Sequence, residues 1–436
     1  MDDDELLGIM ADWNYWGNFR RDWIPRDEYV NHVLDLLKGI NVVALSGIRR
    51  AGKSSVAQQV IREILRRGVD PRDSLIVKLD DERLIDLNYD VLLRIIDLYF
   101  KNVKRSDSVS YVVIDEAQEV DGWERVVRGL AEKGNKVLVT GSSAKLLSSE
   151  YTTLLSGRHV EVRVFPLSLG ELLVFKGVTL REKLDEVTKI QEIERGIEEL
   201  MNLGGFPDVV LHMDIADQLL VSYFETVVLK DVIGRYKIRN ERKLRTLAKF
   251  YITSTGSRIT YNSVSKFLKI PVKTVERYSE YLEKVYILFF LNSFSWTIKV
   301  TENSPRKVYV VDNGFVRVFN PRSSRGRLFE SLVAQHVYRY SLSQRMSLYY
   351  WLDSLEVDLV VAREDQAIPI QVAYDVEDQE VLEREIRALL KFREKCGGDR
   401  SLLVVYRGEE RQISGINVIP ARKFLLHLED YLTFKK

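Results

Sequence analysis

The feature that most constrains this sequence is a short glycine-containing loop between a strand pattern and a helix pattern. Residues 39–47, GINVVALSG, are typical of a fully buried strand, and residues 53–68, KSSVAQQVIREILRRG, place apolar side chains at helical spacing. The loop between them fits the pattern G-x-x-x-x-G-K-[ST] at every fixed position. It consists of Gly47, Ile48, Arg49, Arg50, Ala51, Gly52, Lys53 and Ser54, and Ser55 follows it. This order predicts an α/β fold with a parallel sheet.

The loop has the composition of a phosphate cradle. Its glycines let the backbone curl so that consecutive N–H groups point inward, and the helix start adds partial positive charge. Lys53 is expected to reach the β- and γ-phosphates of ATP, and Ser54 to hold Mg²⁺. Arg49 and Arg50 stand at variable positions and are expected to supply solvated or phosphate-adjacent charge. A chance match in an ordinary strand-to-helix turn is the alternative, and the flanking patterns argue against it.

A second apolar strand pattern ends in two carboxylates. The stretch SYVVIDEAQEV, residues 110–120, runs into Asp115 and Glu116. A nucleotide site needs one carboxylate in the shell of its metal ion and a second that orients and deprotonates water. We assign these roles to Asp115 and Glu116 respectively. An acidic strand end is commonplace by itself, and the phosphate loop upstream is what favours the catalytic reading.

Two later residues are candidates for sensing or stabilising the γ-phosphate. The stretch NKVLVTGSSAKLL, residues 135–147, ends a third strand in polar groups, where Ser142 is either a γ-phosphate sensor or a cap for the next helix. Arg158 follows in a loop before another strand pattern. Its guanidinium either neutralises charge on the transferred phosphoryl group, within the chain or across the interface of a homo-oligomer, or forms a surface ion pair.

Taken in order, these motifs resemble those of archaeal and bacterial AAA-type ATPases that join a P-loop domain to a winged helix and a restriction-endonuclease-like domain. The stretches GGFPDVV at 204–210, YFETVVLKDVI at 223–233 and YYWLDSLEVDLVV at 349–361 extend the likeness over nearly the whole chain. The resemblance implies an ATP-dependent protein acting on or near DNA. The expected division is a P-loop ATPase domain at 1–170, a helical lid at 171–239, a winged-helix domain at 240–320 and an endonuclease-like domain at 321–436.

The middle of the chain is compatible with either DNA or a protein as the partner. Residues 230–249 hold eight Lys or Arg against two acidic residues, which suits either contact with DNA phosphates or a solvated face. Residues 258–294 have the pattern helix, turn, helix, strand of a winged helix. The second of these helices mixes Lys273, Arg277 and Lys284 with glutamates on its exposed face. DNA is the favoured partner, and a protein partner is the alternative.

The C-terminal region lacks part of a nuclease motif. In the related nucleases, a helix glutamate, a strand aspartate and a Glu-x-Lys triplet bind metal and polarise water, and Glu330 and Asp358 match the first two. The triplet position reads Gln371-Val372-Ala373, without the carboxylate or the lysine. We therefore expect the nuclease centre to be disabled, unless Glu356 or Glu364 substitutes. An ATP-dependent nuclease and a regulatory ATPase of toxin–antitoxin or defence type remain as alternatives to an ATPase acting on DNA.

Composition excludes several other classes. In 436 residues, 45% are hydrophobic and 30% charged, and no apolar stretch approaches the roughly 20 residues of a membrane-spanning helix. The single cysteine, Cys396, excludes an internal disulfide framework. The acidic start MDDDELLGIM does not resemble a signal peptide. We expect a cytoplasmic protein without a membrane partner.

Overall fold

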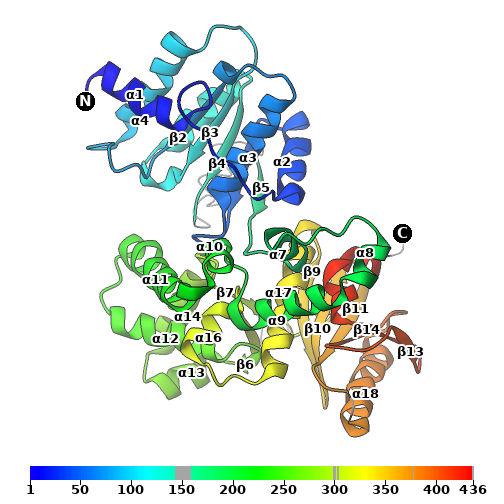
Figure 1. The fold of residues 1–436 in the computed structure, drawn as a ribbon. Coiled ribbons are helices and arrows are strands. Elements are labelled where there is room, and N and C mark those ends of the chain that lie inside the picture. Colours follow the sequence, from blue (N-terminus) through cyan, green and yellow to red (C-terminus); the bar gives the residue numbers. More distant parts are fainter. Residues whose placement is uncertain (143–158, 298–300, 302–303, 377, 435–436) are drawn as a thin grey trace. The chain divides into compact units, whose positions relative to one another are not determined.

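The computed structural model describes residues 1–436 except 143–158, 298–300, 302–303, 377 and 435–436 (Figure 1). The chain divides into two compact units, Met1–Phe165 and Pro166–Lys436. The first unit is built on one sheet, and the second on two.

The first unit is a parallel sheet of five strands in the order β2-β3-β4-β1-β5. The strands are β1 Val42–Ser46, β2 Ser74–Lys78, β3 Tyr111–Asp115, β4 Lys136–Thr140 and β5 His159–Arg163. The helices are α1 Asp3–Trp13, α2 Asp27–Gly39, α3 Lys53–Arg66, α4 Tyr89–Leu98 and α5 Trp123–Glu132, with short η elements at Pro71–Asp73, Tyr99–Val103 and Ala117–Glu119.

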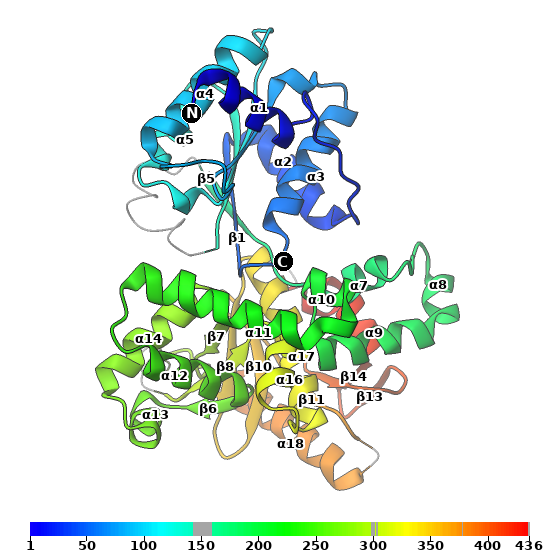
Figure 2. The ribbon, with the colours of Figure 1, turned by 60° about the vertical axis from the view of Figure 1, so that its left-hand side comes forward.

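Helices cover both faces of this sheet, with α2 and α3 on one side and α1, α4 and α5 on the other (Figure 2). The strands are therefore apolar along most of their length rather than alternating. Parallel neighbours end at the same edge. The loop after β1, the carboxylates after β3 and the polar residues after β4 are consequently brought together at the carboxyl edge of the sheet.

The first part of the second unit is helical and encloses a small sheet. Its helical elements are α7 Leu169–Phe175, α8 Lys183–Thr188, α9 Ile190–Leu203, α10 Pro207–Leu211, η5 Met213–Ile215, α11 Ala216–Thr226 and the π-helix η6 Val227–Gly234. There follow α12 Glu241–Thr253, β6 Ser257–Ile259, α13 Tyr261–Leu268, α14 Val272–Lys284, β7 Leu288–Leu291, β8 Arg306–Val310 and α16 Asn313–Phe319. The three strands form an antiparallel sheet in the order β6-β8-β7.

The last part is a mixed six-stranded sheet in the order β13-β14-β12-β11-β10-β9. Its elements are α17 Arg325–Ser343, β9 Ser347–Leu352, β10 Glu356–Arg363, β11 Gln366–Ala373, α18 Gln379–Cys396, β12 Leu402–Val405, β13 Arg411–Ile413, β14 Ile416–Pro420, α19 Ala421–Leu426 and α20 Leu428–Leu432. The stretch LYYWLDSLEVDLVVA, residues 348–362, forms the antiparallel pair β9 and β10, because the polar residues Asp353 and Ser354 fall at a turn.

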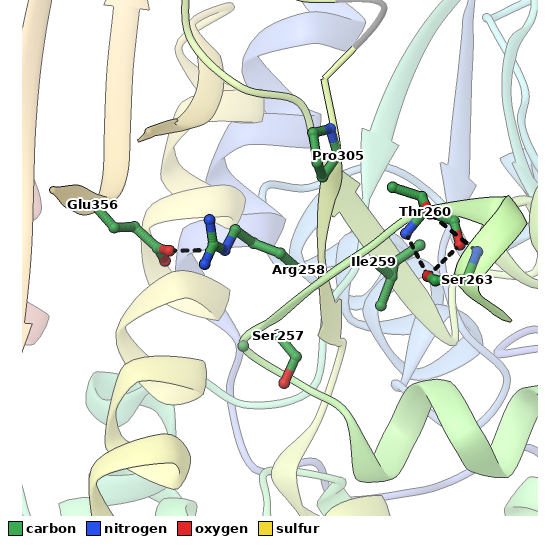
Figure 3. Close-up of a pocket in the computed structure, with 8 residues that line it drawn as sticks. Ser257, Arg258, Ile259, Thr260, Ser263, Pro305 and Glu356 are labelled. Carbon is green, nitrogen blue, oxygen red and sulfur yellow. Dashed lines mark hydrogen bonds and ion pairs between the residues drawn. The ribbon is translucent and has the colours of Figure 1, made fainter. Parts of the chain in front are cut away.

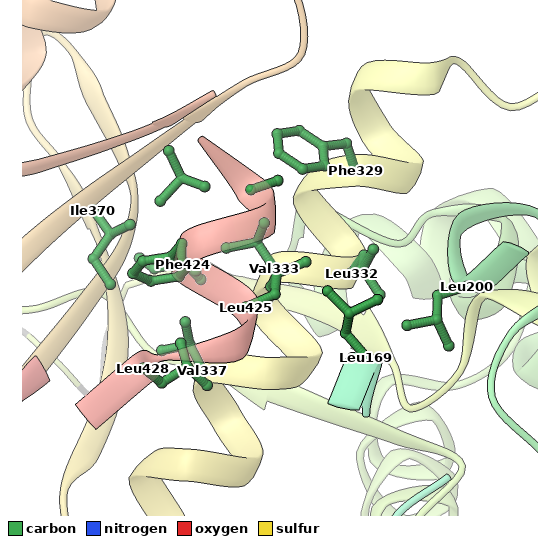
Figure 4. Packing of buried hydrophobic residues seen from close by; sticks show 14 of the residues in the cluster. Leu169, Leu200, Phe329, Leu332, Val333, Val337, Ile370, Phe424, Leu425 and Leu428 are labelled. Carbon is green, nitrogen blue, oxygen red and sulfur yellow. The ribbon is translucent and has the colours of Figure 1, made fainter. Parts of the chain in front are cut away.

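Two apolar layers hold this sheet. On one side, side chains of α17 and α19 pack with strand residues and with α7 and α9, as Figure 4 shows for Val333, Phe424 and Leu200. On the other side, α18 packs Leu389 and Phe392 against the sheet. The C-terminal sheet and the helical elements around α9 therefore share one core. None of the described helices has the length and apolar character needed to cross a membrane.

Candidate nucleotide site

The loop that joins β1 to α3 has a backbone that few residues other than glycine adopt. Gly47 has φ +135° and Gly52 has φ +96°. A Cβ atom at Gly47 would lie 2.1 Å from the carbonyl oxygen of Val164. A side chain at this position would collide with the neighbouring backbone, so glycine is required there for steric reasons.

The start of α3 is left open by its own sequence. No side chain among the described residues caps this N-terminus, and its first turn contains no acidic residue. The first N–H groups of a helix lack intrahelical partners, and they carry partial positive charge. A 14-residue helix that begins in this way, directly after a curled glycine loop, is suited to bind an anion.

The Lys53 ammonium lies against the loop itself. Its side chain is buried, and Nζ donates hydrogen bonds of 3.1 Å to the carbonyl oxygens of both Gly47 and Ile48. Ile48 and Ala51 are also buried and form the apolar base of the loop, whereas Arg50 is exposed. The loop thus presents its amides and one ammonium, and keeps its apolar side chains inside.

Asp115 is the centre of a polar cluster at the carboxyl edge of the sheet. Its Oδ1 accepts hydrogen bonds from Ser54 Oγ at 2.7 Å and from Thr140 Oγ1 at 2.5 Å. The pKa of Asp115 is raised to about 6, mainly by burial and also by the nearby Glu116, whereas the hydrogen bonds from the two hydroxyl groups act in the opposite direction. Ser54 and Asp115 supply the hydroxyl and carboxylate oxygens that Mg²⁺ prefers, and the open loop beside them suits the phosphates that would complete its shell.

Glu116 is held in an uncommon backbone conformation. Its φ is +53°, and its N–H donates to Thr140 Oγ1 at 3.0 Å. The side chain is 9% exposed; its Oε2 lies 3.9 Å from Arg49 Nη2 and accepts a hydrogen bond from the Gln118 amide. A strained residue with a nearly buried carboxylate beside the phosphate loop is well placed to act on water there.

The other predicted residues have different outcomes. Ser142 is fully buried, and its hydroxyl accepts a hydrogen bond of 3.5 Å from Arg49 Nη2, which brings it beside the loop. Ser55 is half-buried in the first turn of α3. Arg158, together with the helix predicted after Ser142, lies outside the described residues.

Two residues near the site were missed in the sequence. Asp80 follows β2, where the N–H of Leu79 bonds to the carbonyl of Asp115 at 3.2 Å, and burial together with Glu116 raises the pKa of Asp80. Arg26 is buried and bonds the carbonyl oxygens of Ala51 at 2.7 Å and Phe165 at 3.0 Å. The position of Asp80 after an apolar strand pattern could have suggested a site residue, whereas no pattern in the sequence points to Arg26.

The residues predicted around the nuclease motif do not all lie in one place. Glu330, Glu356 and Asp358 do lie together, whereas Glu364 stands in the exposed turn between β10 and β11. Gln371 bonds instead to the backbone of Asp358 and to Glu385. The triplet position itself holds no lysine, but Lys307 of β8, from a different part of the chain, lies 3.0 Å from Asp358.

The basic segment 230–249 spans parts of two helical elements. It begins inside the π-helix η6, passes through an irregular turn and continues into α12. Arg245 pairs with Glu225 and Glu241, while Lys237, Arg239 and Arg242 are exposed. Part of the predicted positive charge therefore stands at the surface in a short stretch before and at the start of α12.

Comparison with known proteins places the chain in a family. Residues 40–173 match the family described as "AAA domain", and residues 194–325 and 325–424 match two domains of unknown function, DUF8612 and DUF4143. The chain is 31% identical over 360 residues to the uncharacterized protein MJ1544 of Methanocaldococcus jannaschii, covering 80% of this chain and 78% of that protein. The chain belongs to the same family as this archaeal protein, and its residues 40–173 form an AAA domain. Together with the parallel sheet, the AAA match confirms the predicted P-loop NTPase fold class of the N-terminal unit.

Other relatives of this AAA-domain family member are more distant. An uncharacterized protein of Haemophilus influenzae is 26% identical over 415 residues, covering 92% of this chain and 98% of that protein. Among solved structures, the Walker-type ATPase PABY2304 of Pyrococcus abyssi is 18% identical with a TM-score of 0.45, covering 69% of this chain and 97% of that chain. Cdc6p of Pyrobaculum aerophilum is 13% identical with a TM-score of 0.29, covering 70% of this chain and 96% of that chain.

Proposed function

We propose that this AAA-type protein binds and hydrolyses ATP with Mg²⁺ and uses the hydrolysis to change the conformation of a DNA-bound assembly. One observation carries the proposal. The hydroxyl of Ser54, at the start of α3, lies 2.7 Å from the Asp115 carboxylate, beside an open helix N-terminus and the Lys53 ammonium. The residues that we assign to phosphate binding, to the metal ion and to activation of water all lie at one edge of one sheet, which supports the proposal.

Different residues of the site have different roles in the proposed reaction. Loop amides and Lys53 bind the β- and γ-phosphates, and Lys53 exchanges its bonds to the loop carbonyls for phosphate oxygens. Ser54 and Asp115 hold Mg²⁺, which neutralises charge on the phosphates when it is bound. Glu116 orients water and accepts its proton, and Arg49 lies beside Glu116 at a distance that restrains the carboxylate.

Single substitutions separate binding from chemistry. Lys53→Ala is expected to abolish binding of a fluorescent ATP analogue, whereas Glu116→Gln is expected to bind it normally and to hydrolyse ATP at least 100-fold more slowly, the range of a lost general base. Lys133→Ala and Glu132→Gln remove the same charges from exposed positions at the end of α5 and serve as matched controls. Turnover like the wild type in Glu116→Gln would remove the role assigned to Glu116.

We also propose the division into four parts, of which the last three, a helical lid at residues 171–239, a winged helix at 240–320 and an endonuclease-like domain at 321–436, fall in the second unit. The supporting observation is the element order α12, β6, α13, α14, β7, β8, in which an antiparallel sheet follows a helix pair. The exposed basic stretch at Lys237, Arg239 and Arg242 lies next to it. Phosphate contacts by such side chains make binding depend steeply on salt concentration.

A salt titration tests the DNA partner. Fluorescence anisotropy with a labelled duplex is expected to show binding that weakens with salt, and the triple variant Lys237→Ala, Arg239→Ala and Arg242→Ala is expected to reduce the log–log slope by roughly 0.9 for each lost phosphate contact. A control triple variant removes the exposed basic residues Lys183, Arg363 and Arg411. Absence of any salt-dependent binding to DNA would reject this partner and favour a protein partner, which the mixed charge on the exposed face of α14 also suits.

Assembly is the remaining part of the proposal. A nucleotide site at the surface of one subunit can be completed by an arginine of a neighbouring subunit, and Arg158 is our candidate for that role. Light scattering with and without a slowly hydrolysed ATP analogue measures whether the protein forms a homo-oligomer. Arg158→Ala is expected to retain ATP binding and to lose turnover only under conditions in which the oligomer forms.

A further inference from the structure

The second unit contains a buried lysine surrounded by carboxylates. Lys307 lies on β8, and its side chain is 1% exposed. Its Nζ is 2.7 Å from Glu330 Oε1, 2.7 Å from Glu356 Oε1 and 3.0 Å from Asp358 Oδ1. The lysine comes from the three-stranded sheet, while the carboxylates come from α17 and β10. We call these four residues the Lys307 cluster.

Each carboxylate of the Lys307 cluster also has a partner outside it. Tyr309 donates its hydroxyl to Glu330 Oε1 at 2.6 Å, and the N–H of Val372 donates to Asp358 Oδ2 at 3.0 Å. The guanidinium of Arg258 lies 3.1 Å from Glu356 Oε2. The carboxylates are thus oriented by three different elements toward one central atom, and that atom is the Lys307 nitrogen.

The Lys307 nitrogen lies where the three carboxylates could otherwise bind a metal ion. Three carboxylate oxygens that converge on one point are a typical donor set for a divalent cation, which they bind at about 2.0–2.6 Å. In the Lys307 cluster the same oxygens stand at hydrogen-bonding distance from an ammonium. Among the described residues, no group of three or more His, Cys, Asp or Glu side chains has an arrangement that could hold a metal ion.

The Lys307 cluster is nevertheless reachable from solvent. A cavity of about 530 Å³ is lined by residues of β6 and the start of α13, and it ends on Glu356. Figure 3 shows Arg258 pointing toward Glu356 across this space. The side chain of Glu356 is 28% exposed and that of Glu330 is 19% exposed. A small cation would have access to the carboxylates if their centre were open.

We infer that Lys307 is an internal cation that takes the place of a metal ion at this nuclease-like centre and ties the three-stranded sheet to the C-terminal sheet. The ammonium satisfies the carboxylates without offering an open coordination position for water or a phosphodiester. The same contact joins β8 to α17 and β10, so the two sheets share one charged cluster. The Lys307 cluster therefore holds the two sheets together and does not support metal-dependent cleavage.

Metal binding and thermal unfolding of the full-length protein test this inference. All variants carry Asp115→Asn, so that the nucleotide site does not contribute, and no nucleotide is added. With Lys307 present, Mn²⁺ is expected to leave Tm unchanged and to show no binding by calorimetry. Lys307→Ala is expected to lower Tm by roughly 10 °C, because it leaves uncompensated buried carboxylates. Mn²⁺ is expected to restore much of that loss.

A second variant keeps the test decisive if Lys307→Ala does not fold. Glu330→Gln retains the lysine and two carboxylates, and it is expected to lower Tm by a few degrees without creating a response to Mn²⁺. A rise in Tm with Mn²⁺ in the protein that retains Lys307, lost in Glu330→Gln, would overturn the inference. So would Mn²⁺-dependent cleavage of plasmid DNA that disappears in Lys307→Ala. Equal Tm values with and without Lys307 would overturn the attachment role.

Discussion

Thr140→Val gives the sharpest test of how the carboxylates of Asp115 and Glu116 are positioned. The Thr140 hydroxyl donates to Asp115 Oδ1 and accepts the N–H of Glu116 at 3.0 Å, and valine has nearly the same shape without the hydroxyl. An unpaired buried N–H costs about 1–3 kcal/mol, and a hydrogen bond to a charged group contributes about 1.5–3 kcal/mol. Because Ser54 still bonds to Asp115, we expect a total loss of about 3 kcal/mol.

This loss has two measurable consequences. For a unit of this size, thermal unfolding of the first unit is expected at a temperature about 6–12 °C lower. If the poorer orientation of Glu116 raises the activation free energy of hydrolysis by about 1.4 kcal/mol, ATP turnover is expected to fall about tenfold. Affinity for the nucleotide is expected to change less, because the loop amides and Lys53 are untouched.

Thr140→Ser is the matched control, since it keeps the hydroxyl and removes only a methyl group. Its turnover and unfolding temperature are expected to remain close to those of the wild type. If Thr140→Val matches the wild type in both measurements, the hydroxyl does not position the carboxylates, and the reasoning about this edge of the sheet is refuted.

Three further predictions concern Arg26 and Gly47 at the loop after β1 and the buried His336 of α17. Arg26→Lys cannot make both of its carbonyl bonds, so nucleotide affinity is expected to fall several-fold in a binding titration, because the Ala51 end of the loop is released. Gly47→Ala forces a Cβ into the backbone and is expected to abolish nucleotide binding, with the exposed Gly68→Ala as control. Burial lowers the pKa of His336 to about 4, so the unfolded chain binds more protons between pH 6.5 and 4. Stability is therefore expected to fall as pH decreases through this window, and His336→Gln is expected to remove that part of the dependence in Tm measured against pH.

The fold of the first unit could be predicted because its signals are local. The strand before Gly47, the acidic end of β3 and the polar end of β4 are each contained in about ten consecutive residues. Parallel strands then bring their ends to one edge without further information. The roles of Lys53, Asp115 and Glu116 remain predictions, but their proximity follows from the topology.

The residues that were missed depend on contacts between distant parts of the chain. Arg26 bonds to Phe165, which is 139 residues away, and Lys307 bonds to Asp358, which is 51 residues away. Neither contact has a spacing that periodicity can reveal. The motif at residues 371–373 is local and contains no lysine, so it gives no sign of Lys307, which reaches the carboxylates from a strand of another sheet.

Hydrogen bonds through Arg26 connect the loop after β1 to the end of the first unit. Arg26 ties Ala51 of the loop to Phe165, the last residue of the first unit. Two residues further on, the N–H of Leu167 bonds to the carbonyl of Gly205 at 2.6 Å. Since Pro166 alone separates these two contacts in the sequence, any displacement of the loop would have a short covalent route into the second unit.

Asp312 is the next point on that route, directly after β8. Its two carboxylate oxygens accept the N–H groups of Gly205 at 2.6 Å and Gly314 at 2.8 Å. Burial raises the pKa of Asp312 to about 7, although both N–H bonds favour the charged form. Asparagine offers only one acceptor here, and its amide group would face one of the two backbone N–H groups.

Asp312→Asn is therefore expected to destabilise the second unit by about 1–3 kcal/mol, the cost of one unpaired buried donor. Asp217→Asn removes the same charge from an exposed ion pair with Arg317 and is expected to cost less than about 1 kcal/mol. Neither residue contacts the nucleotide loop, so basal ATP turnover is expected to stay constant in both. If DNA stimulates turnover, Asp312→Asn is expected to reduce the stimulation and Asp217→Asn to preserve it. Equal stimulation in the two variants would show that the hydrogen bonds at Gly205 stabilise the fold without transmitting the state of the nucleotide site.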